Sequence, residues 1–359
     1  MKILILANFD VGLYQFRKET IERLLTDNEV VISLPYGKLV DPLCEMGCRF
    51  VDTPMERRGL NPFRDLSLFF RYLHLLSKEK PDKVLAYTIK PNIYGGLACR
   101  IKKIPYYSFI TGLGSIFQSE SFIKKMVTVM YRTGIKKASR IFFENAENLR
   151  IFEESGISDT SHSVLLNGAG VNLEHYKVSD YPAEPEVGFL YMGRVMKEKG
   201  IDELFSAMKR LRAEGYDCVL DVLGIPEEDH NSAIGEGVSE GWLRFHGFQE
   251  DVRPFIGKAH CFVLPSWHEG MANTNLEAAA SGRPVITSNI PGCREAVIDG
   301  ESGFLCEAKD SGSLYEAMKR FILLPHGEKE AMGIAGRHHM EEVFDKKKVV
   351  EETIKHLFI

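Results

Sequence analysis

Short apolar runs alternate with segments of helical periodicity through the first 150 residues. Leu66, Phe69, Phe70 and Leu73 recur at i, i+3, i+4 and i+7, which predicts an amphipathic helix packed on a sheet. The apolar runs read as strands, and because they are nearly continuous in hydrophobicity they indicate a parallel sheet covered on both faces. The predicted strands are KILILAN, EVVISLP, KVLAYT, YYSFIT and RIFFEN.

The same alternation restarts after a polar, proline-bearing stretch at 177–187. Its predicted strands are VGFLYMG, DCVLDVLG, LRFHGF, CFVLPSW, RPVITS and GFLCEA. The pattern predicts an α/β protein of two doubly wound, Rossmann-like domains facing a central cleft. We expect the first domain over 1–170, the second over 171–340, and a terminal helix over 341–359 that packs back toward the first.

Composition narrows the class of protein. The 359 residues carry a net charge of −5, which gives no global indication of nucleic acid as a partner. Seven scattered cysteines are typical of reduced thiols in a cytoplasmic protein. The opening MKILILANFD is too short in its apolar run for a signal peptide, and no run reaches the about 18 apolar residues of a membrane-spanning helix. The chain is therefore expected in the cytoplasm.

A pair of glutamates marks the first candidate site. Glu269 follows the strand CFVLPSW, and Glu277 lies eight residues later in an early turn of the next predicted helix. Ligands bind at the carboxyl ends of strands in open α/β sheets, so both carboxylates can face one ligand and accept bonds from sugar and ribose hydroxyls. The N–H groups of Gly270, Met271 and Ala272 suit a phosphate or sugar oxygen. The alternative is that a glutamate stands near this helix N-terminus only because the helix dipole stabilises it, and binds no ligand.

A pair of cations marks the second candidate site. Arg194 and Lys199 lie five residues apart in GRVMKEKGID, directly after the strand VGFLYM. Two cations there can neutralise a diphosphate without a metal, and the chain contains no Asp-x-Asp motif. The alternative is solvated surface charge, since KEK is common on exposed turns.

Five ordered motifs carry a family resemblance: GRVMKEKGI, VLG, FHGF, PSWHEGMANTNLEAAASGRPVI and GCREAVIDGESGFL. This half of the chain resembles the retaining glycosyltransferases of family 4, which have the glycosyltransferase B fold. The resemblance implies a donor diphosphate held by Arg194 and Lys199, ribose hydroxyls by Glu277, and contact of Glu269 with the transferred sugar. It implies further donor contacts from Gly12, Gly193, Gly224, His246, Gly247, Phe248, Gly270, Met271 and Ala272. Ala272 and Asn273 stand where relatives commonly carry an aromatic residue or proline.

The N-terminal half resembles a narrower group. RRGLNPFRDL, YTIKPNIYGG and ITGLGSIF are similar to bacterial enzymes that add a sugar, such as N-acetylgalactosamine, to an undecaprenyl-diphosphate-linked acceptor. The resemblance implies acceptor contacts from Lys90, Asn92, Thr111 and Gly112. Many relatives carry a histidine in this last loop, and none stands at 111–114 here.

A basic segment follows the YTIKPNIYGG motif and includes ITGLGSIF. From 97 to 140 there are nine Lys or Arg and one acid, interleaved with apolar residues. Such a surface suits anionic lipid headgroups, and Lys124, Lys125, Lys136 and Lys137 are its predicted membrane-facing cations. The alternative is a helix with an apolar core face and a solvated basic face.

These observations predict a retaining, metal-independent hexosyltransferase without a cofactor. It is expected to move a hexose of the N-acetylhexosamine type from a UDP-sugar to a polyprenyl-diphosphate-linked sugar. The reaction is expected on the cytoplasmic face of the inner membrane. Two alternatives stay open: a nucleotide-sugar epimerase of the same architecture, and a non-catalytic nucleotide-sugar-binding protein. A nicotinamide enzyme is disfavoured because neither TGLGSI nor NGAG supplies the third glycine of G-x-G-x-x-G.

Overall fold

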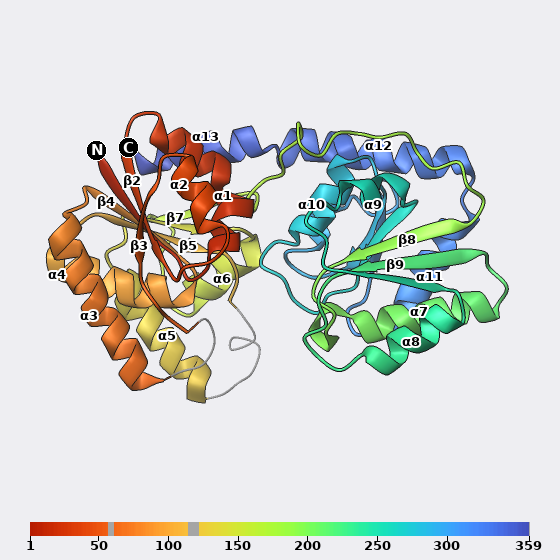
Figure 1. Ribbon diagram of the computed structural model, residues 1–359, viewed down its shortest axis with the longest axis horizontal. Coiled ribbons are helices and arrows are strands. Elements are labelled where there is room, and N and C mark those ends of the chain that lie inside the picture. Colours follow the sequence, from red (N-terminus) through yellow and green to blue (C-terminus); the bar gives the residue numbers. More distant parts are fainter. Residues whose placement is uncertain (57–60, 114–121, 359) are drawn as a thin grey trace. The chain divides into compact units, whose positions relative to one another are not determined.

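The chain forms two compact units, seen in a computed structural model that describes residues 1–56, 61–113 and 122–358 (Figure 1). Unit 1 comprises Met1–Ala169 and Lys347–Ile359, and unit 2 comprises Gly170–Lys346. Each unit is a parallel sheet with helices on both faces. The predicted fold class of two doubly wound α/β domains is confirmed.

The sheet of unit 1 has the strand order β3-β2-β1-β4-β5-β6-β7. Successive side chains of a strand point to opposite faces of the sheet. In β1, Ile3 and Ile5 therefore pack in the core on one face, and Leu4 and Leu6 pack in the core on the other. The strands are β1 (Lys2–Leu6), β2 (Glu29–Leu34), β3 (Arg49–Asp52), β4 (Lys83–Tyr87), β5 (Tyr106–Ile110), β6 (Arg140–Phe143) and β7 (Ser163–Leu165).

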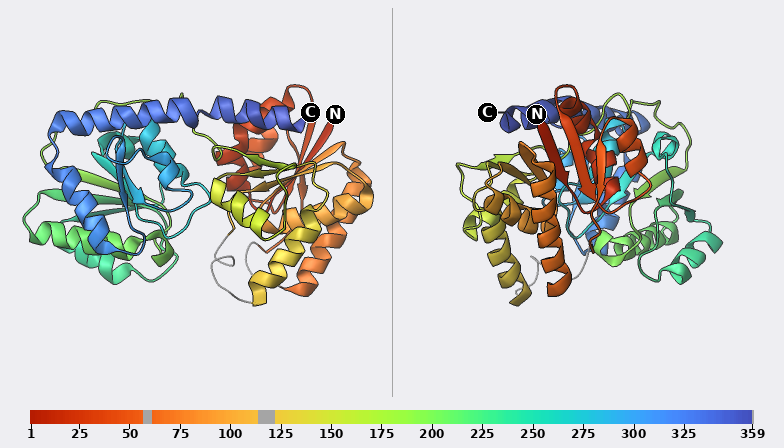
Figure 2. Two further views of the ribbon diagram at one scale, coloured as in Figure 1. Left: turned by 180° about the vertical axis from the view of Figure 1, so that it is seen from behind. Right: turned by 60° about the vertical axis from the view of Figure 1, so that its left-hand side comes forward.

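Two groups of helices cover this sheet (Figures 1 and 2). One face is covered by α1 (Asp10–Leu25), α2 (Val40–Glu45) and α13 (Lys346–Leu357). The other is covered by α3 (Pro62–Glu79), the π-helical turn η1 (Pro91–Gly95), α4 (Gly96–Lys102), α5 (Phe122–Ile135) and α6 (Ala146–Glu154).

The helix predicted around Leu66 forms as α3, and Phe69 and Leu73 of the predicted stripe pack against the core, but the other two residues of the stripe do not. Leu66 is 53% exposed and Phe70 is 57% exposed, whereas Leu68 and Tyr72 lie in the core. The helix carries apolar residues on two faces, and a helical period alone does not say which face meets the sheet. Its outer face therefore presents apolar side chains to solvent.

The sheet of unit 2 has the order β10-β9-β8-β11-β12-β13, and all six predicted strands form. They are β8 (Val187–Met192), β9 (Cys218–Leu223), β10 (Leu243–Gly247), β11 (Cys261–Leu264), β12 (Val285–Ser288) and β13 (Gly303–Cys306). The helices are η3 (Lys197–Lys199), α7 (Ile201–Ala213), α8 (Asn231–Ser239), α9 (Arg253–Lys258), α10 (Asn273–Ala280), η4 (Arg294–Ala296), α11 (Ser311–Leu323) and α12 (His326–Val343).

Each sheet reverses its winding once. In unit 2 the chain proceeds outward from β8 through β9 to β10 and then returns to β11 on the other side of β8. In unit 1 the same reversal lies between β1 and β4. The helices on either side of a reversal cross over to opposite faces, which opens a crevice at the carboxyl ends of the two central strands.

The chain passes between the units twice. At the end of unit 2, Val171 forms a parallel bridge with Asp345, and its N–H donates to the carbonyl oxygen of Phe344 at 2.7 Å. Beyond that bridge α13 packs on unit 1, where the hydroxyl of Tyr107 donates to the carbonyl oxygen of Leu357 at 3.0 Å and Lys83 donates to the same oxygen. Among the described residues, no helix is long and apolar enough to cross a membrane.

Candidate active site

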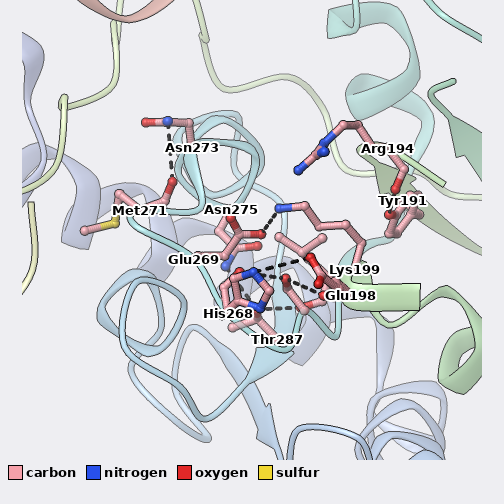
Figure 3. Close-up of polar contacts among 12 residues, drawn as sticks. Tyr191, Arg194, Glu198, Lys199, His268, Glu269, Met271, Asn273, Asn275 and Thr287 are labelled. Atoms are coloured by element: carbon pink, nitrogen blue, oxygen red, sulfur yellow. Dashed lines mark hydrogen bonds and ion pairs between the residues drawn. The ribbon is translucent and has the colours of Figure 1, made fainter. Parts of the chain in front are cut away.

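The reversal point of unit 2 brings together two side chains that the sequence singled out 70 residues apart. The ammonium of Lys199, from the turn after β8, forms a close ion pair with a carboxylate oxygen of Glu269, from the loop after β11 (Figure 3). The two side chains are only 17% and 13% exposed. They meet because β8 and β11 are neighbours in the sheet and both run toward the same edge.

Arg194 reaches the same region from the end of β8. The hydroxyl of Tyr191 donates to the carbonyl oxygen of Arg194 at 2.7 Å and so holds the turn, while the guanidinium donates to Glu227 at 2.8 Å. Figure 3 shows the guanidinium of Arg194 and the ammonium of Lys199 projecting toward one space. The Arg194 side chain is 43% exposed, so most of its donors are accessible to a ligand.

The strand ends around this site approach so closely that they need glycine. A Cβ on Gly224, at φ +152°, would stand 1.7 Å from the carbonyl oxygen of Gly193. A Cβ on Gly200, at φ +74°, would stand 2.0 Å from the carbonyl oxygen of Pro265. No side chain fits at either position, so these glycines set the spacing of β8, β9 and β11 beneath the cations.

The loop that carries Glu269 is held from below by polar contacts that the sequence did not reveal. The buried amide of Asn275 donates to the hydroxyl of Thr287 at 3.0 Å, and that hydroxyl donates to the carbonyl oxygen of Leu264 at 2.8 Å. These bonds fix the start of α10 against β11 and β12. The expectation that the N–H of Ala272 faces a ligand is wrong, because it donates to the carbonyl oxygen of Gly292 at 2.7 Å.

Gly270 and Met271 directly precede Ala272 in the chain. The side chain of Met271 is 7% exposed and that of Ala272 is 3% exposed, so both side chains belong to the core of unit 2. Gly270 is half-buried. Any ligand contact from this stretch is therefore made through backbone atoms.

Glu277 lies in the second turn of α10, in a different environment from Glu269. Burial raises the pKa of its carboxyl to about 7, partly offset by a hydrogen bond from Tyr176 and by the positive charge of Lys346. Burial likewise raises the pKa of the Tyr176 phenol, so this hydroxyl is a donor at neutral pH. Tyr176 was not predicted as a site residue, because nothing in its sequence context indicates a contact with α10.

The HGF motif forms the end of β10. The ring of His246 bonds through Nε2 to Asp221 at 2.6 Å and packs on Phe255 with ring centroids 4.8 Å apart. The carbonyl oxygen of Gly247 accepts from the N–H of Gly224 at 2.8 Å, and Phe248 is 62% exposed. The motif thus stands at the carboxyl edge of the sheet with a free aromatic surface.

The candidate residues of unit 1 also lie at a carboxyl edge. Gly12 stands in the first turn of α1, directly after β1. Lys90 forms a buried ion pair with Asp65 at 2.7 Å. Asn92 is fully enclosed, and its amide donates to the carbonyl oxygen of Phe109 at 2.9 Å, so we assign Asn92 to the support of η1 rather than to ligand contact.

Thr88, within the YTIKPNIYGG motif, is a further polar residue of this edge that was not predicted as a site residue. It adopts φ +73°, which is uncommon for a β-branched residue, and its buried hydroxyl has no hydrogen-bond partner among the described residues. Thr111 and Gly112 are half-buried after β5. The rest of their loop, 114–121, lies outside the described residues, as does 57–60 of the RRGLNPFRDL motif.

The four predicted membrane-facing lysines do not form one cluster. Lys124 and Lys125 belong to the first turn of α5, whereas Lys136 and Lys137 follow its last residue. Twelve residues of helix span about 18 Å, so the two pairs stand at opposite ends. Lys125, Lys136 and Lys137 are exposed and Lys124 is half-buried.

Comparison with known proteins assigns both halves of the chain. Residues 186–323 match the family described as "Glycosyl transferases group 1". Residues 2–145 match the family described as "Glycosyl transferase 4-like". The two matches follow the two structural units, one in each.

Two curated relatives match nine tenths or more of the chain. An N,N'-diacetylbacillosaminyl-diphospho-undecaprenol alpha-1,3-N-acetylgalactosaminyltransferase from Campylobacter jejuni is 25% identical over 99% of this chain and 98% of its own. A UDP-Gal:alpha-D-GlcNAc-diphosphoundecaprenol alpha-1,3-galactosyltransferase from Escherichia coli is 25% identical over 90% of this chain and 86% of its own. Among solved structures, Anabaena HepE in complex with UDP and glucose superposes with a TM-score of 0.81 at 16% identity, covering 99% of both chains. The chain is a glycosyltransferase of the glycosyltransferase B fold, with a 4-like domain in unit 1 and a group 1 domain in unit 2.

Proposed function

We propose that this glycosyltransferase moves an N-acetylhexosamine from a UDP-sugar to a polyprenyl-diphosphate-linked sugar, with retention of configuration. The observation that carries the proposal is the cluster of Arg194, Lys199 and Glu269 at the reversal point of unit 2. Support for the donor comes from the similar fold of a protein that holds UDP and glucose. Support for the acceptor comes from two relatives named for undecaprenyl-diphosphate-linked sugars.

The two cations act on the leaving group. As the bond between the sugar's anomeric carbon and the β-phosphate oxygen breaks, negative charge develops on the diphosphate. Arg194 and Lys199 stabilise that charge, which is an interaction stronger in the transition state than in the ground state. The acceptor hydroxyl attacks from the same face of the sugar, and its proton passes to the departing phosphate oxygen.

Glu269 serves this reaction by position rather than as a nucleophile. Its carboxylate is already bound to the Lys199 ammonium, which lowers its nucleophilicity and fixes its direction. From there it can accept hydrogen bonds from hydroxyls of the transferred sugar. The same ion pair holds the Lys199 ammonium in place before the donor arrives.

The two alternatives account for less of the site. An epimerase needs an acid and a base flanking one sugar carbon, and the described contacts of Glu269 and Glu277 lead to Lys199 and Tyr176 instead. A binding protein needs no leaving-group cations. The curated relatives described above are named as transferases.

Product analysis tests the function directly. The purified protein would be incubated with a panel of radiolabelled UDP-sugars and a short-chain polyprenyl-diphosphate sugar, and extracted lipid counted. We expect label in the lipid fraction with one N-acetylhexosamine donor and an α-linkage by NMR. A β-linked product, or epimerised UDP-sugar without lipid product, would contradict the proposal.

UDP affinity is expected to fall as the pH drops below about 7. Only the ionised carboxylate of Glu277, whose pKa is about 7, accepts hydrogen bonds from both ribose hydroxyls, so UDP binds in competition with a proton. Affinity should be highest above that pH and fall by up to about tenfold for each unit below it. Calorimetric titration across this pH range measures the effect. The reference ligand is 2′,3′-dideoxy-UDP, which keeps the diphosphate but lacks the ribose hydroxyls, so the contribution of phosphate protonation cancels in the comparison.

Two variants separate the source of this pH dependence. Glu277→Gln should bind UDP weakly with the pH response of the dideoxy reference. Tyr176→Phe removes a bond that lowers the Glu277 pKa, so it should shift the response to higher pH while leaving turnover at saturating donor near wild type. An unchanged response in both variants would remove Glu277 from the ribose site.

Chelation is expected to leave turnover within about twofold of the untreated enzyme. Arg194 and Lys199 supply fixed positive charge where metal-dependent transferases use a divalent cation. The measurement is initial rate after dialysis against EDTA, with and without added Mg²⁺ or Mn²⁺. A loss restored by either ion would contradict metal-independent catalysis.

The membrane is the place where such an acceptor is held, and unit 1 offers a surface for it. The amino-terminal ends of α3 and α5 lie side by side (Figures 1 and 2). Exposed apolar side chains on them are Phe63, Leu66, Phe70, Ile123, Met126 and Val129. Lys124 and Lys125 flank this set, which we call the apolar end of unit 1. Apolar side chains beside cations suit an anionic bilayer surface, so we propose peripheral binding to the cytoplasmic face.

A further inference from the structure

A cavity at the opposite edge of the unit 1 sheet is not used by the proposed reaction. It has a volume of about 530 Å³ and is lined by the end of α5 and the loop between α6 and β7. Ile141, at the start of β6, and Ala138, just before it, form part of its wall. It therefore lies at the amino ends of the strands, whereas Gly12, Lys90 and Thr111 lie at the carboxyl ends.

Three cations face this cavity. Arg100 comes from the last turn of α4, Arg132 from the last turn of α5, and Lys136 follows α5. The only acid among the lining residues is Asp159, whose Oδ1 accepts from the Ser161 hydroxyl at 2.5 Å. Asp159 also lies 3.0 Å from Nδ1 of His162, another lining residue, so one carboxylate stands against three cations and the lining carries an excess of positive charge.

The two guanidiniums are held in fixed positions. Arg132 Nη2 donates to the carbonyl oxygen of Ser155 at 2.6 Å, and Arg100 donates to the carbonyl oxygen of Thr133. Each of these bonds uses one of five N–H donors, so a planar fork remains available to a ligand. Gly156, at φ +60°, lies directly beside Arg132. A Cβ added to this glycine would be in ordinary van der Waals contact with Arg132, 3.5 Å from Nη2.

The rest of the lining defines the ligand. Ile135 and Ile157 form an apolar floor, and Ser158 adds a polar side chain to the lining, whereas the hydroxyl of Thr133 donates back to the carbonyl oxygen of Val129 at 2.8 Å. Two rigid forks and an ammonium match the geometry of phosphate oxygens, and the floor accepts the few carbons attached to them. We propose that this cavity is a second anion site, which binds a phosphate group on a small ester or on a lipid headgroup.

Calorimetry with inorganic pyrophosphate tests this site, with the full-length enzyme saturated with UDP to occupy the donor site. We expect one remaining binding event in the wild type. In Arg132→Gln/Lys136→Gln the affinity should fall at least tenfold. Lys78→Gln/Lys80→Gln, which removes two exposed cations at the same edge of the sheet, should bind as the wild type does.

A second pair of variants leaves both guanidinium braces intact. Gly156→Asp places a carboxylate beside Arg132 and should abolish pyrophosphate binding, whereas Gly156→Asn, with the same shape and backbone preference, should retain it. Absence of pyrophosphate binding to the UDP-saturated wild type, or equal binding by the Asp and Asn variants, would overturn the proposal. Because UDP occupies its own site throughout, this result is independent of the proposed transfer reaction.

Vesicle flotation distinguishes the two sources of phosphate. The probe is phosphatidylcholine vesicles with and without phosphatidylglycerol. If the site takes lipid headgroups, Gly156→Asp should reduce binding to the anionic vesicles relative to Gly156→Asn, and pyrophosphate should displace the wild type. If vesicle binding is the same for both variants while pyrophosphate binding differs, the ligand is a soluble phosphate ester.

Discussion

Replacement of Lys199 by alanine is expected to lower turnover roughly 100- to 1,000-fold, equivalent to about 3–4 kcal/mol of lost transition-state stabilisation. The ammonium is largely buried beside Glu269, so its charge acts on the leaving diphosphate with little screening by water. Arg194→Ala should cost more than tenfold but less than Lys199→Ala, because its guanidinium is 43% exposed. Initial rates at saturating donor and acceptor measure both effects.

Lys197→Ala is the matched control. Lys197 belongs to the same turn, η3, and is exposed to solvent, so its loss should leave turnover within about twofold of wild type. The double variant Lys199→Met/Glu269→Gln separates two causes of inactivity. If it recovers most of the activity, the single variant fails because Glu269 is left unpaired, and Lys199 has no direct role on the diphosphate.

Removing the apolar end of unit 1 should abolish binding to anionic vesicles and transfer to a long-chain lipid acceptor. The variant Phe63→Ser/Phe70→Ser/Lys124→Glu/Lys125→Glu removes two exposed aromatic side chains and reverses two charges. Each basic residue near an anionic surface contributes about 1 kcal/mol, and burial of an aromatic side chain contributes about 2 kcal/mol, so affinity should fall well over 100-fold. Liposome co-sedimentation at low and high salt measures the loss.

Donor hydrolysis and transfer to a short-chain, water-soluble acceptor should survive in this variant. A matched control, Leu323→Ser/Lys80→Glu, removes an exposed apolar residue and a cation elsewhere and should pellet with vesicles as the wild type does. If the fourfold variant and the wild type pellet equally, the outer face of α3 is simply exposed to solvent and does not bind the membrane. Lys136 and Lys137 are left unchanged here because they stand at the other end of α5.

The strands were predictable because burial on both faces leaves a direct mark in sequence. β1 and β8 are nearly continuous apolar runs. The unpredicted β3 and β7 lie at the sheet edges and are only four and three residues long, too short for a hydrophobic pattern to stand out. The outer face of α3 misled the prediction because apolar periodicity records that a face avoids water, not whether a core or another surface covers it.

The clustering of the candidate site residues was predictable only where these residues lie in the loops that follow strands. Arg194, Lys199 and Glu269 stand at strand ends, so a correct strand assignment places them at one edge. Tyr176 and Thr287 were missed because their roles depend on partners about 100 and 12 residues away in the chain. Such contacts follow from packing, and a single sequence carries no periodic signal for them.

The path of α13 has a consequence for biosynthesis. Val350, Ile354 and Leu357 belong to the core of unit 1, although they are translated after all of unit 2. Domains usually fold in the order in which they leave the ribosome, but here unit 1 is completed only after α13, which follows unit 2 in the chain, has been synthesised. Unit 2, which is contiguous, can complete its fold earlier. A nascent chain stalled before Val350 would therefore leave exposed the apolar side chains that α13 covers, among them Tyr107 of β5 and Phe142 of β6.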